Sequence, residues 1–391
     1  MTVALACGLT GCAGASQDAT ADAGRIRELV RDMTPKVERA VGLTFRAEPG
    51  IAVRSEDDVR SYLIHKLDNE LPPEELERLV LAYRLFGMIP DTLDMRALLL
   101  DLYLEQVVGY YDPDSSALYV VRGANETTLS FTLAHELVHA LQDQYLALDS
   151  LLSLKRQNDR RMAAQAVLEG QATVASLLVV APSLGAQLAE GSWNDYWRAV
   201  REQHKQMPVF NEAPLVIREG LVFPYLAGGQ FISWFMREYP DTVPFGARLP
   251  TSTEQVLHPE RYRRGDVPVA LAFRLEEAFY EDGLGEFETR ILLTTLTGSD
   301  SIASRTAHGW GGDRYAVLTA RDGHALVWWT VWDTAPAADR FAGTVRERWT
   351  VAAPRRIAVE RTSVGDLPAV LVVMAPEGWE GWDDVPEVEV R

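Results

Sequence analysis

Cysteine is nearly absent from this chain of 391 residues, and its two copies, Cys7 and Cys12, stand at the extreme N-terminus. The rest of the sequence therefore cannot form a disulfide or a cysteine-ligated metal site, so the stability of its fold must come from a hydrophobic core. With 47% hydrophobic and 24% charged residues, a chain of this length can bury such a core and is long enough for two domains.

Clusters of positive charge are missing as well. The chain has 38 lysines and arginines against 56 aspartates and glutamates, and no basic stretch is long enough to follow a phosphate backbone. This balance argues against nucleic acid as a partner. Apolar runs are short, since the segment 172–182 ends in a proline before it reaches the roughly 18 to 20 residues of a membrane-spanning helix. The sequence therefore predicts a soluble body.

The first twelve residues are small and apolar, and Leu9-Thr10-Gly11-Cys12 resembles a bacterial lipobox. A lipobox implies that Cys12 becomes the lipidated first residue of an exported lipoprotein. Residues 13–24 are small and polar, as expected of a tether. The segment has no positively charged start, which leaves an ordinary N-terminal tail as the alternative. We expect residues 1–20 to be signal, anchor and tether, and the protein to be extracytoplasmic, held at the membrane by this anchor alone.

Hydrophobic periodicity predicts an α+β protein with a mainly helical domain over residues 21–295 and a smaller α+β domain over residues 300–391. Short strands are expected at 51–54 and at 117–122, the second directly before the helix 127–148. The C-terminal domain is expected either to form one wall of a cleft or to bind a partner. Its tryptophans alternate with apolar residues in predicted strands, which favours core packing over a carbohydrate or partner platform. They are Trp310, Trp328, Trp329, Trp332, Trp349, Trp379 and Trp382.

The predicted helix 127–148 carries the segment His135-Glu136-Leu137-Val138-His139. On a helix, two histidines four residues apart project from one face and can reach one metal ion. Glu136 is angled so that its carboxylate can face a water on that ion, take its proton and pass it to a leaving amine. The neighbouring residues are apolar, so the alternative of an exposed face with incidental histidines is disfavoured.

A tetrahedral zinc site with an open position needs a third protein ligand. Glu169 is the best candidate, because its neighbours on the predicted helix 160–180 are small or apolar and a buried carboxylate needs a cation. The alternative is a solvent-facing charge. Gly170 is expected to let this helix approach the helix of the two histidines closely. Asp143 is expected either to accept a hydrogen bond from a ligand imidazole or to be an exposed helix charge. Zinc is inferred from the ligand types, which also suit other divalent ions.

These motifs resemble the gluzincin branch of zinc metallopeptidases, in which a glutamate on a following helix is the third ligand. The resemblance is closest to a group of poorly characterised bacterial and archaeal surface proteins or lipoproteins, and covers roughly residues 43–265. It implies a zincin fold, a zinc ion and an extracytoplasmic location, and names no substrate. Many gluzincins have an aspartate where this chain has Thr173. The segments that carry the resemblance are 104–113, 135–145, Glu169-Gly170-Gln171-Ala172, 252–262 and, more weakly, 309–315.

Enzymes of this kind usually add a histidine or tyrosine that stabilises the transition-state oxyanion. His258 and Tyr262 are the leading candidates here, ahead of Tyr110, Tyr111 and His308, and a purely structural role is the alternative for each. The strand 117–122 is expected to be the edge strand on which such enzymes lay an extended substrate.

The sequence thus predicts a zinc metallopeptidase acting on a peptide or protein substrate, with zinc held by His135, His139 and Glu169 and with water activated by Glu136. Two alternatives stay open. One is a metal-bearing, non-catalytic surface lipoprotein that acts as a binding module. The other is a zinc hydrolase that cleaves a non-peptide bond.

Overall fold

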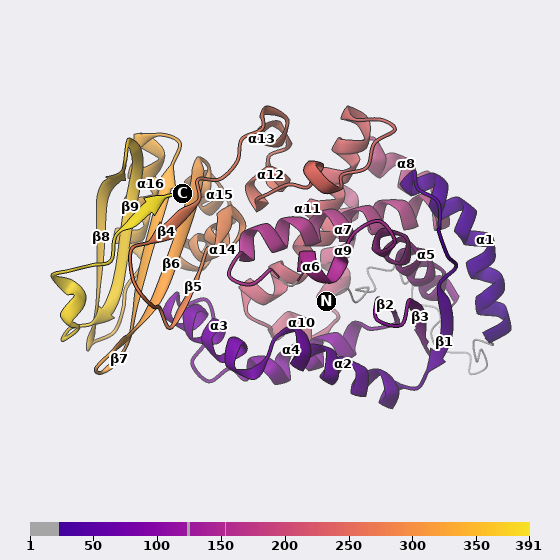
Figure 1. Cartoon of the computed structure of the whole chain (residues 1–391), viewed down its shortest axis with the longest axis horizontal. Helices are drawn as coiled ribbons and strands as arrows, with labels where there is room; N and C mark the ends of the chain where they lie inside the picture. Colours follow the sequence, from indigo (N-terminus) through magenta and orange to yellow (C-terminus); the bar gives the residue numbers. More distant parts are fainter. Residues whose placement is uncertain (1–22, 123–125, 153) are drawn as a thin grey trace.

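The computed structural model describes residues 23–122, 126–152 and 154–391, and it confirms the predicted α+β class. A helical region that holds a small mixed sheet is followed by a C-terminal antiparallel sheet, and α1 and that sheet lie at opposite ends of the molecule (Figure 1). The predicted lipobox falls on residues outside the described ranges, so the anchor stays a prediction.

The N-terminal region is built mainly of helices, and local sequence explains several of their starts. Ser55 caps α2 as a capping box, because its hydroxyl accepts from the Asp58 N–H while the Asp58 carboxylate accepts from the Ser55 N–H. The helices are α1 (Ala23–Val41), α2 (Glu56–Glu70), α3 (Pro73–Leu85), α4 (Met95–Gln106), α5 (Glu126–Asp143), α6 (Leu148–Leu152), α7 (Asn158–Val180), α8 (Pro182–Ala189), α9 (Asn194–His204), α10 (Pro208–Glu212), α11 (Leu215–Glu238), η1 (Gly246–Arg248), α12 (Thr253–Leu257) and α13 (Pro259–Arg264).

The small sheet has the strand order β1 (Gly50–Arg54), β3 (Ala117–Val121), β2 (Gly109–Asp112). β1 runs parallel to β3, and β2 runs antiparallel to it. The prediction that the strand at 117–122 lies at the edge is therefore wrong, because β3 is paired on both sides. A short edge strand does precede α5, but it is β2.

Helix α7 packs between α5 and α11 and forms the centre of the helical region (Figure 1). By length and composition α7 could cross a membrane, but most of it is buried inside the protein, as in the core helix of a globular fold. Gly170 does allow a close helix approach, although to α11 and not to α5 as predicted. A Cβ atom on Gly170 would overlap the backbone of Gly228, and one on Gly228 would overlap the Ala166 carbonyl.

The C-terminal sheet has the strand order β5-β6-β7-β9-β8, with antiparallel pairing throughout. Five of the seven tryptophans are buried, as predicted, whereas Trp379 and Trp382 are only half-buried. The elements of this region are β4 (Leu271–Phe273), β5 (Tyr280–Asp282), α14 (Gly285–Thr297), α15 (Asp300–Ala307), β6 (Trp310–Ala320), β7 (Gly323–Trp332), α16 (Ala335–Arg348), β8 (Arg355–Val364), β9 (Leu367–Pro376), η2 (Glu380–Trp382) and β10 (Val388–Val390).

The C-terminal sheet also contacts the start of α7. The Asp282 carboxylate, on β5, accepts a hydrogen bond of 3.0 Å from the N–H of Asn158, the first residue of α7. Such a bond satisfies one of the free N–H groups at a helix start. The domain boundary predicted near residue 300 stays a prediction, while β5 already belongs to the C-terminal sheet at residue 280.

Candidate metal centre

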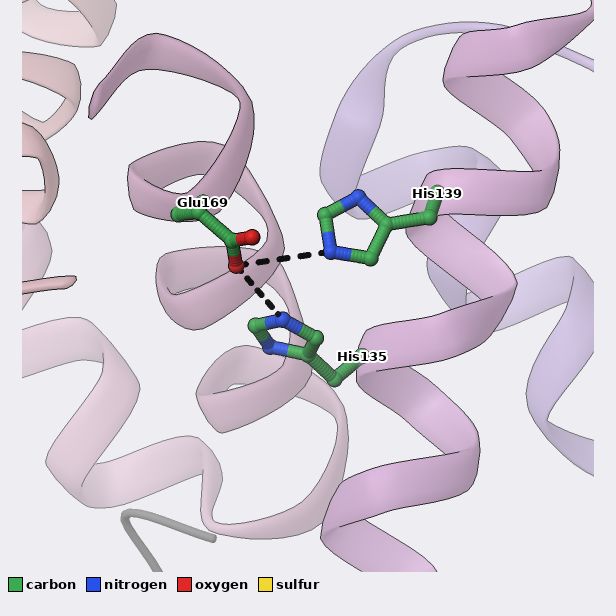
Figure 2. Close-up of side chains that lie close together, drawn as sticks. All are labelled: His135, His139 and Glu169. Carbon is green, nitrogen blue, oxygen red and sulfur yellow. Dashed lines mark hydrogen bonds and ion pairs between the residues drawn. The ribbon is translucent and has the colours of Figure 1, made fainter. Parts of the chain in front are cut away.

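Helices α5 and α7 bring together the three side chains that were predicted to be metal ligands. His135 and His139 extend from α5 toward Glu169 on α7, and their donor atoms lie within 4.8 Å of one another (Figure 2). Glu169 Oε2 is 3.1 Å from His135 Nε2 and 3.4 Å from His139 Nε2. Ligand atoms bound tetrahedrally to zinc at about 2.0–2.1 Å lie roughly 3.3 Å apart. The spacing therefore fits one zinc-sized ion.

The centre is completely buried. The exposed fraction is 0% for His135, His139 and Glu169 and 1% for Glu136. Within the described part of the chain, Glu169 Oε1 and His135 Nδ1 have no hydrogen-bond partner. Because a buried carboxylate and buried imidazoles are costly without compensating charge, this arrangement favours a bound cation.

The electrostatics of the three side chains lead to the same conclusion. Burial would raise the pKa of Glu169, but the charge of His139 and the close contacts with both imidazoles outweigh it and hold the pKa at about 2. Burial would lower the pKa of His139, yet Glu169 and, less strongly, Glu136 raise it to about 9. Burial dominates at His135, whose pKa is lowered. The raised pKa of His139 beside the carboxylate of Glu169 thus favours a positive charge at the place where a metal ion would be held.

The side chain that hydrogen-bonds to the His139 imidazole within α5 is Gln142 and not Asp143. Gln142 Oε1 lies 2.8 Å from His139 Nδ1. Asp143 instead accepts a hydrogen bond of 2.9 Å from the Tyr111 hydroxyl. The two alternatives considered for Asp143 were a bond from a ligand imidazole and an exposed charge, and the structure gives it a third role in attaching α5 to β2.

Glu136 is held by the edge strand β2. Its Oε2 accepts a hydrogen bond of 2.6 Å from the backbone N–H of Tyr111. Tyr111 therefore contacts α5 twice, through its backbone at Glu136 and through its hydroxyl at Asp143. Sequence reasoning considered Tyr111 only as an oxyanion donor, because the pairing of β2 with α5 is a long-range contact.

The structure gives His258 and Tyr262 partners outside the three-ligand group. His258 Nε2 lies 2.9 Å from the Glu286 carboxylate on α14, and the Tyr262 hydroxyl donates to the Arg248 carbonyl at 2.8 Å. Their catalytic roles stay predictions. Tyr225 of α11 lies closer to the ligands, since its ring stacks on that of His135 with centroids 5.9 Å apart. It was not predicted, although it stands three residues before Gly228, at the contact between α11 and α7.

Comparison with known proteins adds one finding. Residues 274–376 match a family described as a domain of unknown function (DUF8575). The match runs from the residue after β4 to the end of β9 and does not include the metal ligands. No curated protein and no solved structure matches the chain.

Proposed function

We propose that this protein is a zinc metallopeptidase of the gluzincin type. The observation that carries the proposal is the convergence of His135, His139 and Glu169 on one buried point, with Glu136 on the same helix as the histidines. Two imidazoles and one carboxylate form a donor set that suits zinc and leaves a coordination position open.

Each residue then has a defined chemical task. When bound, zinc supplies a Lewis acid that lowers the pKa of a coordinated water toward neutrality. The Glu136 carboxylate accepts the water proton and delivers it to the leaving amine of the cleaved peptide. The Tyr111 N–H fixes the Glu136 carboxylate through Oε2, so the position of the base is set by β2. With its predicted lipobox, the enzyme would act on peptides or proteins outside the cytoplasm.

A second candidate is a metal-bearing surface lipoprotein without catalytic activity. Burial favours it, because Glu136 and the three ligands are closed to solvent in this conformation. A peptidase must open the centre to admit its substrate, whereas a structural metal ion needs no access.

The variant Glu136→Gln separates the two candidates. Glutamine keeps the size of the side chain and can still accept the Tyr111 N–H, but it cannot take a proton from water. Zinc-loaded wild type and variant are compared on an unfolded protein substrate and on a panel of esters. For a peptidase, we expect wild-type cleavage of the protein and a loss of roughly 10²- to 10⁴-fold in the variant at unchanged zinc content.

The other outcomes decide against a peptidase. Cleavage of esters alone identifies a hydrolase of non-peptide bonds. Equal inactivity of zinc-loaded wild type and variant on both substrate classes supports the non-catalytic candidate. His65→Ala is the control, because His65 is an exposed histidine on α2.

A further inference from the structure

We propose that Gln142 is a positioning residue that determines which nitrogen of His139 faces the metal, and that the Leu168 carbonyl determines the orientation of Gln142. This inference rests on the metal centre proposed above. It concerns residues that are not themselves ligands, and it assigns the role that the sequence suggested for Asp143.

Gln142 connects the two helices that carry the ligands. It stands on α5, three residues after His139, and its exposed fraction is 0%. Its Oε1 lies 2.8 Å from His139 Nδ1. Its Nε2 lies 3.0 Å from the Leu168 carbonyl and 3.0 Å from Gln171 Oε1, both on α7. Leu168 directly precedes Glu169, so one buried side chain links the surroundings of two ligands.

The Leu168 carbonyl determines which atoms donate and which accept in the contacts of Gln142. A backbone carbonyl can only accept, so the Gln142 atom beside Leu168 must be the NH₂ group. The atom beside His139 is therefore the amide oxygen, which can only accept. His139 Nδ1 must then carry a hydrogen and donate it. In the reversed amide orientation, two oxygens would face each other at the 3.0 Å separation from Leu168.

The consequence for the metal concerns the other ring nitrogen. A neutral imidazole with its hydrogen on Nδ1 has its lone pair on Nε2. In His139, Nε2 is the atom turned toward Glu169, 3.4 Å from its Oε2 (Figure 2). The orientation set by Gln142 thus leaves the lone pair of His139 pointing to the place between the three ligands.

The Gln142 amide has contacts on both ligand-bearing helices, so its removal tests the proposal. Replacing Gln142 by methionine keeps a side chain of similar length but removes every hydrogen bond, so His139 Nδ1 loses its acceptor. Residues that orient metal-bound histidines in this way typically contribute about 10- to 100-fold in metal affinity. We expect a loss of zinc affinity in this range for Gln142→Met.

The first test uses metal-free wild type and follows hydrogen exchange of the Gln142 side-chain NH₂ group by NMR. Two donated bonds inside the core predict slow exchange for both hydrogens. Exchange as fast as that of an exposed glutamine overturns the proposal, whatever metal the protein binds. The test therefore still decides the orientation of Gln142 if wild type binds no zinc and the proposed metal centre is wrong.

The second test compares zinc affinity in wild type, Gln142→Met and the control Gln106→Met. Gln106 is a buried glutamine on α4, with an exposed fraction of 4%. We expect weaker binding only in the Gln142 variant, and ¹⁵N NMR of zinc-loaded wild type should show coordination through Nε2 of His139. Wild-type affinity in folded Gln142→Met, or coordination through Nδ1, overturns the proposal. If Gln142→Met does not fold, Gln142→Glu replaces it: a carboxylate still accepts from Nδ1 and should keep Nε2 coordination, and coordination through Nδ1 in this variant overturns the proposal.

Discussion

Zinc binding should release one proton per protein molecule, and His139 is the group that releases it. Burial lowers the pKa of His139, but the charges of Glu169 and Glu136 outweigh this effect and raise the pKa to about 9. Glu169, with its pKa held at about 2, is already ionised at pH 7. His135, whose pKa is lowered, is already neutral. Only His139 therefore has to lose a proton before it can bind a metal ion.

The size of the effect follows from the pKa of His139. At pH 7, two units below a pKa of about 9, only about one His139 side chain in a hundred is neutral. Since the metal binds the neutral imidazole, the apparent zinc affinity should rise about tenfold per pH unit up to pH 9 and then level off.

Calorimetry in two buffers of different ionisation enthalpy measures the number of protons released. We expect a value near one at pH 7. In Glu169→Gln the negative charge beside His139 is absent, so its pKa falls and any residual binding should release fewer protons. A wild-type release near zero, or a zinc affinity that does not change between pH 6 and pH 8, would refute this reasoning.

Three further predictions concern stability and activity. In denaturant titrations, the free energy of unfolding of chelator-treated protein should fall by about 3 kcal/mol between pH 6.5 and pH 9. The raised pKa of His139 stabilises the folded state fully below pH 6.5, and this stabilisation is lost as the pH rises through 9. Zinc-loaded protein should not show this fall. Gly170→Ala should destabilise the protein by about 1–3 kcal/mol and so lower its melting temperature, because the new Cβ would overlap Gly228. The control is Gly343→Ala on α16, where a Cβ meets open space and the melting temperature should stay unchanged. Equal melting temperatures for the two variants would contradict the close packing of α7 on α11. Tyr111→Phe should reduce kcat severalfold at unchanged zinc content, and an unchanged kcat would show that the Asp143 bond does not position Glu136.

The sequence predicted the parts of the centre that depend on local geometry. His135 and His139 could be assigned to one face because helical spacing alone determines it. Glu169 could be assigned because a carboxylate among small, apolar neighbours implies burial beside a cation. Both inferences needed only the helix that carries the residue.

The errors came from contacts between segments far apart in the chain. The sequence order of β1 and β3 does not reveal that they pair, so the strand at 117–122 was placed at the edge. Gly170 indicated a close helix approach without indicating that α11 is the partner. Positions 142 and 143 both follow His139 by about one turn, and only the neighbouring helix α7 decides that Gln142 reaches its imidazole.

The zinc content of the purified protein, measured by elemental analysis, tests the proposed centre most directly. Wild type, His139→Ala and Glu169→Ala are purified identically, with His65→Ala as the control for loss of a histidine. We predict about one zinc ion per chain in wild type and in the control, and none in the two ligand variants. A folded wild type without metal, or ligand variants that keep it, would contradict the assignment of His135, His139 and Glu169 as a metal centre.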